Sequence, residues 1–147
     1  WDVFIKNTHE VLGPLHKATA HQRLSRLEFV GGGRAVRQAQ YGQGEDATRV
    51  TVNFGEAAAK VATALGGDVV LPQWGFVVEG PRFAAFYALR WSDRDYDKGA
   101  LFAIESADDE NLSETARVRV FHGFGPASIQ WRGKVYQVSR EQVIQAD

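Results

Sequence analysis

Hydrophobic and polar residues alternate most regularly between residues 50 and 91, and we interpret this stretch as the centre of a sheet. Val50, Val52 and Phe54 alternate with polar residues, which is the period-2 pattern of a strand with one buried and one wet face. A second extended segment is predicted at 75–79, directly after a turn that contains a proline, which cannot donate a ladder hydrogen bond. The pattern therefore predicts successive strands rather than a helix.

The run from residue 83 to residue 91 is apolar on both of its faces. One face carries Phe83, Ala85, Tyr87, Leu89 and Trp91, and the other carries Ala84, Phe86 and Ala88. A strand with two apolar faces needs packing partners on both sides. We therefore expect a central strand here, with Trp91 buried in the core beside Phe83 and Tyr87.

Shorter strand patterns recur along the rest of the chain. They lie at 24–30, 36–41, 49–54, 100–106, 116–122, 129–131 and 134–138. Residues 42–46 and Arg132-Gly133 are typical of hairpin turns. A polar loop is expected at 92–99, and a terminal turn of helix at 140–144.

Segment 56–65 is open to two interpretations. Its alanines favour helix by intrinsic propensity, and two glycines follow where a helix could end. Val61, Thr63 and Leu65 alternate, however, and strands are predicted on both sides. We favour a strand, because tertiary context commonly overrides propensity in so short a segment.

An amphipathic helix is predicted at the start of the chain, from residue 2 to residue 12, and Gly13-Pro14 should end it. Phe4, Val11, Leu12 and Leu15 form an apolar stripe along one helix face. This stripe must pack against the rest of the domain or against a preceding domain, and we take its four residues as a candidate domain interface.

These elements predict a mainly β fold, an antiparallel β-sandwich of about nine or ten strands with an N-terminal helix. Turn signals about every 8 to 12 residues favour a sandwich over a parallel sheet, which would need helices between its strands. The predicted organisation is a helix and linker at 1–22, followed by a sandwich domain at 23–147.

Composition narrows the classes of partner. The 147 residues carry 17 basic and 18 acidic side chains, a formal net charge of −1, so neither nucleic acid nor an anionic membrane is an expected partner. The chain has no cysteine, which leaves its compartment undetermined. It also has no methionine and begins with tryptophan, so we expect a piece of a larger protein.

Two groups of residues are candidate ligand sites. Asp93, Asp95 and Asp97 place carboxylates at alternate positions in the predicted loop, which suits calcium, although a solvated hairpin loop is the competing interpretation. Trp74 and Trp131 are candidate platforms for sugar rings, and the competing interpretation is that such large aromatic residues fill the core.

The sequence contains no nucleophile elbow, phosphate loop or dinucleotide-binding glycine pattern, and no catalytic residue is assigned.

Three stretches resemble parts of a known architecture. WDVFIKNTHEVLGPLHKATAHQRL is similar to the final barrel helix and exit segment of multidomain glycoside hydrolases. VTVNFG and LPQWGFVVEGPRFAAFYALRW resemble strand pairs of the β-sandwich domain that follows such a barrel. The alanine-rich segment 56–65 departs from that pattern, which has a plainly extended segment there. The resemblance implies that an upstream barrel carries the catalytic carboxylates while this module packs against it.

Three functions are therefore considered. The first is a non-catalytic C-terminal module that packs against and stabilises the catalytic domain of a glycoside hydrolase-like protein. The second is a carbohydrate-binding module that uses exposed tryptophans, and the third is a small stand-alone enzyme. Whether these residues belong to an enzyme depends on whether a catalytic domain precedes them in the same protein.

Overall fold

The computed structural model describes residues 2–31 and 33–146, and the side chains from residue 5 onward. One helix precedes a series of strands. Their bounds are α1 (Asp2–Thr19), β1 (Leu24–Val30), β2 (Val36–Tyr41), the short 3₁₀ helix η1 (Gly44–Asp46), β3 (Thr48–Asn53), β4 (Ala59–Thr63), β5 (Gly67–Leu71), β6 (Phe76–Glu79), β7 (Phe83–Trp91), β8 (Arg94–Ser106), β9 (Arg117–Phe124), β10 (Ser128–Trp131), β11 (Lys134–Gln137) and β12 (Glu141–Gln145).

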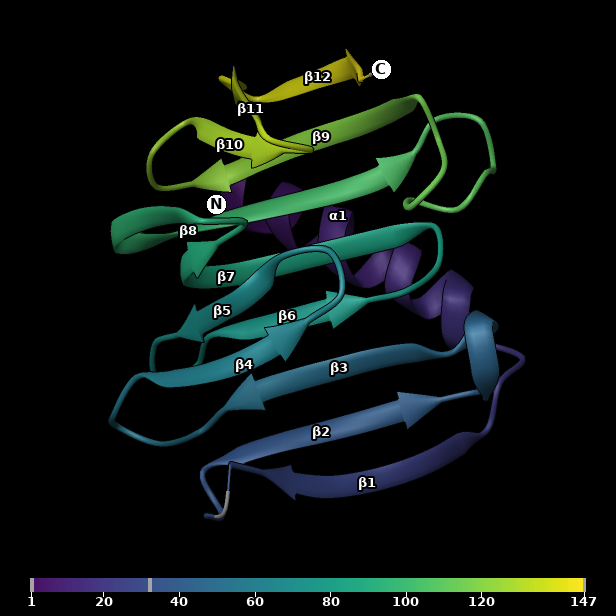
Figure 1. Cartoon of the computed structure of the whole chain (residues 1–147), viewed down its shortest axis with the longest axis vertical. Helices are drawn as coiled ribbons and strands as arrows, with labels where there is room; N and C mark the ends of the chain where they lie inside the picture. The colour runs from purple at the N-terminus through teal and green to yellow at the C-terminus, as the bar shows by residue number, and fades with distance from the viewer. Residues whose placement is uncertain (1, 32, 147) are drawn as a thin grey trace.

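The strands build one large antiparallel sheet and one small one. The path of the large sheet is β1-β2-β3-β6-β7-β8-β9-β12, so β1 and β12 are its two edges. The β4–β5 hairpin joins the same ten-stranded sheet through β7, while β10 and β11 pair separately. In Figure 1, α1 lies behind the large sheet and the β4–β5 hairpin lies in front of it. The predicted class, mainly β and antiparallel with an N-terminal helix, is confirmed.

The face of the sheet under the hairpins holds the larger core, and we call it the hairpin face. Trp91, Phe86 and Phe102 are buried here, and the Trp91 ring stacks on Phe86 and on Trp131 of β10 with centroids 4.7 and 6.3 Å away. The hydroxyl of Tyr96 donates to the carbonyl of Ser128 at 2.8 Å. These contacts join the β10–β11 hairpin to the sheet and form a second layer.

The opposite face, which we call the helix face, holds a smaller core. Val11 and Leu15 of α1 pack there against Phe83, Leu101 and Phe121. α1 contacts mainly β7 and β9. Among the described residues, no helix covers this face over β1 and β2 (Figure 1).

The helix does not end at Gly13-Pro14, so that prediction is wrong. α1 continues through Pro14 to Thr19. Proline in a helix loses one hydrogen bond and crowds the carbonyl four residues earlier, but Leu15 beyond it packs into the core. The hydroxyl of Thr19 also donates to the carbonyl of Leu15 at 2.9 Å. Burial of this last turn outweighs the local signal.

The ambiguous segment 56–65 contains strand β4, as favoured from the sequence. The hairpins at 42–46 and Arg132-Gly133 are also confirmed. The prediction of a helical turn at 140–144 is wrong, because residues 141–145 form edge strand β12, which pairs with β9. Its pairing partner is distant in sequence, and no local pattern reveals that.

The prediction of a loop at 92–99 is also wrong. Ser92 and Asp93 have φ of 50° and 62°, the two left-handed residues of a tight hairpin turn, and β8 begins at the next residue. The β7–β8 pairing then has a register shift between Ala88 and Arg90. An irregularity of this kind changes which face later residues point to. Trp91 is therefore buried on the hairpin face, and not with Phe83 as its spacing predicted.

Among the described residues, no helix is long and apolar enough to cross a membrane.

Candidate functional site

The uncovered part of the helix face carries a line of aromatic side chains linked by one arginine. The Arg37 guanidinium lies 5.4 Å from the Phe29 ring centre and 5.3 Å from that of Phe54. The Phe54 ring meets Trp74 edge to face at 5.9 Å. We call Phe29, Arg37, Phe54 and Trp74 the aromatic row.

Strand register explains why these residues meet. Phe29 pairs with Arg37, Arg37 with Val52, and Val52 with Phe76, which packs against the helix-face core. Cross-strand partners in an antiparallel sheet share a face. Phe54 follows Val52 by two residues and so continues the same face at the end of β3.

The aromatic row is exposed. The exposed fractions of Phe29, Phe54 and Trp74 are 49%, 44% and 61%. Large apolar residues that are exposed singly are ordinary, but a contiguous group on one face is typical of a surface that contacts another molecule.

Trp74 is held in a backbone conformation that tryptophan rarely adopts. Its φ is 65°, and the N–H of Gly75 donates to the carbonyl of Pro72 at 2.8 Å, so Trp74 is the third residue of a β-turn. Such a position normally favours glycine, and a larger residue there costs about 1–2 kcal/mol. Strain at an exposed aromatic residue suggests a functional role.

Asn53 fixes this turn. Asn53 is fully buried. Its backbone carbonyl accepts a hydrogen bond from the N–H of Trp74 at 2.7 Å, and its backbone N–H donates to the carbonyl of Gly75 at 2.9 Å. The side-chain amide of Asn53 donates to the carbonyls of Ala57 and Leu71 at 2.9 and 3.0 Å. The Trp74 ring is therefore presented from a well-anchored backbone.

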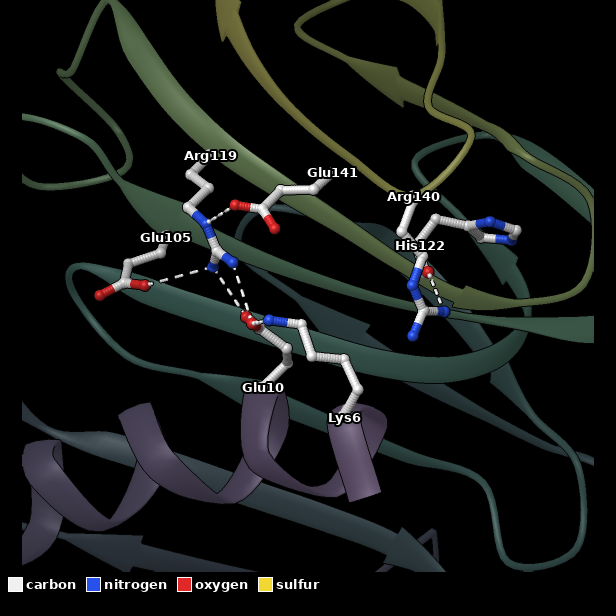
Figure 2. Close-up of polar contacts among 7 residues, drawn as sticks. All are labelled: Lys6, Glu10, Glu105, Arg119, His122, Arg140 and Glu141. Atoms are coloured by element: carbon white, nitrogen blue, oxygen red, sulfur yellow. Dashed lines mark hydrogen bonds and ion pairs between the residues drawn. The ribbon is translucent and has the colours of Figure 1, made fainter. Parts of the chain in front are cut away.

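An ion-pair cluster holds α1 on the same face (Figure 2). Arg119 of β9 makes a two-pronged contact with Glu10 of α1, through bonds of 2.7 and 2.9 Å. Lys6 also reaches Glu10 at 2.7 Å, and Arg119 reaches Glu141 of β12 at 2.7 Å. The side chain of Glu10 is 6% exposed. The cluster thus joins α1 to two strands that are far away in sequence.

The cluster shifts the ionisation of its members. The hydrogen bond from Arg119 is the largest cause that lowers the pKa of Glu10 to about 2, and it outweighs the opposing effect of burial. The same guanidinium lowers the pKa of Glu141, and the two carboxylates in turn raise the pKa of Arg119. All three groups are charged at neutral pH.

The first turns of α1 lie beside the end of β9. The side-chain amide of Asn7 donates to the carbonyl of Gly123 at 3.5 Å, and Lys6 lies over the Phe121 ring. Phe124, which follows Gly123, is 42% exposed, and its ring centre lies 5.2 Å from that of Tyr87. Exposed apolar surface on this face therefore extends to Phe124 at the end of β9.

The predicted interface stripe is divided by the structure. Val11 and Leu15 are used inside the domain, whereas Leu12 points outward and is 54% exposed. Ile5, seven residues before Leu12 and 49% exposed, shares this outer side. The side chain of Phe4 lies outside the described residues.

The two candidate tryptophans lie in contrasting places. Trp74 is on the surface, whereas Trp131 is 3% exposed and stacks on Trp91 in the hairpin-face core. Trp131 therefore has no face free to stack on a sugar, and its burial corrects its assignment as a platform.

The three candidate metal ligands do not gather around one point. Asp93 is in the tight turn, while Asp95 and Asp97 are on β8, and both Asp93 and Asp95 bind Arg90, at 3.4 and 2.7 Å. Within the described part of the chain, no group of three histidine, aspartate or glutamate side chains could hold a metal ion.

Phe29, Arg37 and Asn53 are not among the candidates that the sequence pattern indicates. Alternation within β1 and β2 was the available signal, because it sets the face of Phe29 and of Arg37. It could not show that these two residues pair, since register depends on the whole sheet.

Comparison with protein-family models, with characterised proteins and with solved structures found no match to this chain.

Proposed function

We propose that this chain is a non-catalytic module of a larger glycoside hydrolase-like protein, and that the helix face of its sheet packs against the catalytic domain and stabilises it. The aromatic row is the observation that carries this proposal. The glycoside hydrolase context rests on the resemblance of the opening segment and of the VNFG and LPQWGF segments alone.

The exposed surface has the composition of an interface between domains. Phe29, Phe54 and Trp74 supply flat apolar area, and Arg37 lies between two of the rings, where it can bind a carboxylate or a carbonyl of a partner. Aromatic residues and arginine are enriched in protein interfaces. Leu12 and Ile5 extend the apolar area onto the outer side of α1.

The position of the helix start supports the same partner. A domain joined ahead of α1 would emerge beside Gly123 and Phe124, on the face that carries the aromatic row. The ion-pair cluster fixes α1 on the sheet, so this connection would enter at a defined angle. A catalytic domain in that place could reach the row without a long linker.

A second candidate function is carbohydrate binding through Trp74. The specific observation that favours it is the strained turn that presents an exposed indole. Binding of polysaccharide by the 147-residue chain, lost on Trp74→Ala, would favour this function over packing. Packing predicts no such binding.

The first test is the intact mass of the protein purified from its natural source. Our proposal requires a mass well above the 16.3 kDa of this chain. A natural protein of 16.3 kDa would overturn it.

The second test uses Phe54→Ser in the protein as its gene encodes it. Loss of a buried interface ring should make the junction ahead of α1 more sensitive to proteolysis and lower the melting temperature of the catalytic domain by about 2–4 °C per 1 kcal/mol lost. The matched control is Val135→Ser, which is 50% exposed and lies on β11 of the separate β10–β11 hairpin. Equal behaviour of the two variants would contradict the proposal.

A further inference from the structure

Edge strand β1 differs from every other strand of the large sheet because no residue in it is buried. Six of its seven residues are exposed on one face or the other, and in the described residues β1 pairs with β2 alone. It forms the lower edge of the sheet in Figure 1. The N–H and C=O groups on its outer side can therefore form hydrogen bonds with another strand. Most proteins avoid an exposed edge of this kind.

We propose that β1 pairs antiparallel with β1 of a second copy of this chain, about a two-fold axis at Leu27, so that the two sheets become continuous. This inference goes beyond the packing role, because it concerns the sheet edge and a different partner.

The charges of β1 select this register. A two-fold axis perpendicular to the sheet keeps each face on the same side, so each residue pairs with one from the same face of the other copy. Centring the pair on Leu27 sets Arg26 opposite Glu28 of the copy, and Glu28 opposite Arg26 of the copy. Centring it on Arg26 or on Glu28 sets like charges opposite each other, which is unfavourable.

Neither Arg26 nor Glu28 faces an opposite charge on β2. The β2 partners of Arg26 and Glu28 are the neutral Gln40 and Gln38. The ion pair that the structure shows for Arg26 and Glu28 is a 3.9 Å contact with each other, at side-chain exposures of 63% and 46%. Pairing with a copy would turn this weak contact into an alternating group of four charges.

The other face of β1 suits the same register. Leu27, 66% exposed, would meet Leu27 of the copy, and Phe29 would lie diagonally beside it. The irregularity between Leu24 and Arg26 limits regular pairing to a short segment. The dimer should therefore be weak, dependent on concentration and closed at two copies.

Charge reversal tests the register directly. Arg26→Glu gives a chain with two negative charges on β1, and Glu28→Arg gives one with two positive charges, so each should dimerise at least about tenfold more weakly than wild type. An equimolar mixture of the two variants restores opposite pairs and should form a mixed dimer. Sedimentation velocity from about 1 µM to about 1 mM measures this, with twice 16.3 kDa as the expected limit.

Cross-linking gives a second readout that does not depend on the charge variants. The chain has no cysteine, and a residue on the two-fold axis faces itself at a Cα separation of about 4.5–5.5 Å, which a disulfide can bridge. Leu27→Cys should therefore form a disulfide dimer under mild oxidation. Val143→Cys on edge strand β12, 54% exposed, is the matched control and should not.

Three results would overturn the proposal: a wild-type chain that stays monomeric over the whole concentration range, charge variants that dimerise as well as wild type, or equal cross-linking at Leu27→Cys and Val143→Cys. Circular dichroism of each variant establishes that it is folded before the comparison is made.

Discussion

The two faces of the large sheet are covered in different ways. On the hairpin face, Trp131 of β10 and Val61 of β4 extend the core outward from Phe86, Trp91 and Phe102. On the helix face, one helix covers part of the sheet, is held by the Glu10–Arg119 pair and leaves the aromatic row open. The hairpin face therefore contributes mainly to the stability of the domain, while the helix face keeps exposed apolar surface that a partner can contact.

The largest expected effect is on the hairpin face. Phe102 is fully buried and touches Phe86, Tyr96 and His122 with centroids 5.6, 6.0 and 4.9 Å away. Phe102→Ala should lower the free energy of unfolding by about 3–5 kcal/mol, since it leaves a cavity among these rings. Urea unfolding measures the change.

Phe124 on the helix face is the matched control for this substitution. It is 42% exposed, so Phe124→Ala should cost about 1 kcal/mol or less. Similar losses for the two variants would mean that the faces do not differ as described.

The next largest effect is the pH dependence of the stability that Glu10 contributes by holding α1 on the helix face. Glu10 has an ordinary pKa of 4.5 and a folded-state pKa of about 2. Because the folded value is depressed, its contribution is complete above pH 4.5 and is lost as the pH falls from 4.5 towards 2. The full difference between these two pKa values corresponds to about 3–4 kcal/mol, and screening by solvent lowers the expected contribution to about 2–3 kcal/mol.

Glu10→Gln tests that contribution. The variant should be less stable than wild type near neutral pH, and the difference should shrink as the pH falls towards 2, which urea unfolding at a series of pH values can follow. Glu114→Gln, which removes an exposed carboxylate from the loop before β9, is the control. A Glu10→Gln penalty that is the same at every pH would show that the carboxylate charge does not hold the helix.

The smallest expected effect is at Trp74. Trp74→Gly loses the edge contact with Phe54 but relieves the positive φ, and these two changes are each worth about 1 kcal/mol with opposite signs. The free energy of unfolding should therefore change by less than about 1 kcal/mol. A loss above about 2 kcal/mol would mean that Trp74 serves stability rather than contact with a partner.

Local patterns were sufficient wherever one strand or one turn decides its own structure. Alternation located β3, β7 and β9, and glycine placed the turns at 42–46 and Arg132-Gly133. The mainly β class with an N-terminal helix follows from these elements, because period-2 segments with short turns leave few other arrangements.

The candidate site was only partly predictable. Trp74 could be identified as a tryptophan next to a turn, and its exposure agrees with that choice. Trp131 has a similar local context at a hairpin but is buried under Trp91. Nothing in either local sequence distinguishes the two, since burial depends on which hairpin folds over the sheet.

The kinds of element and the turns between them follow from local sequence, because backbone sterics and side-chain alternation act over a few residues. Long-range packing and pairing account for three other features: α1 runs through Pro14, residues 141–145 form a strand, and Trp91 points to the hairpin face. Each of these depends on a partner far along the chain: the core under Leu15, strand β9, and the register of β7 against β8. The aromatic row and the open edge of β1 arise in the same way, from the pairing of strands rather than from any one of them.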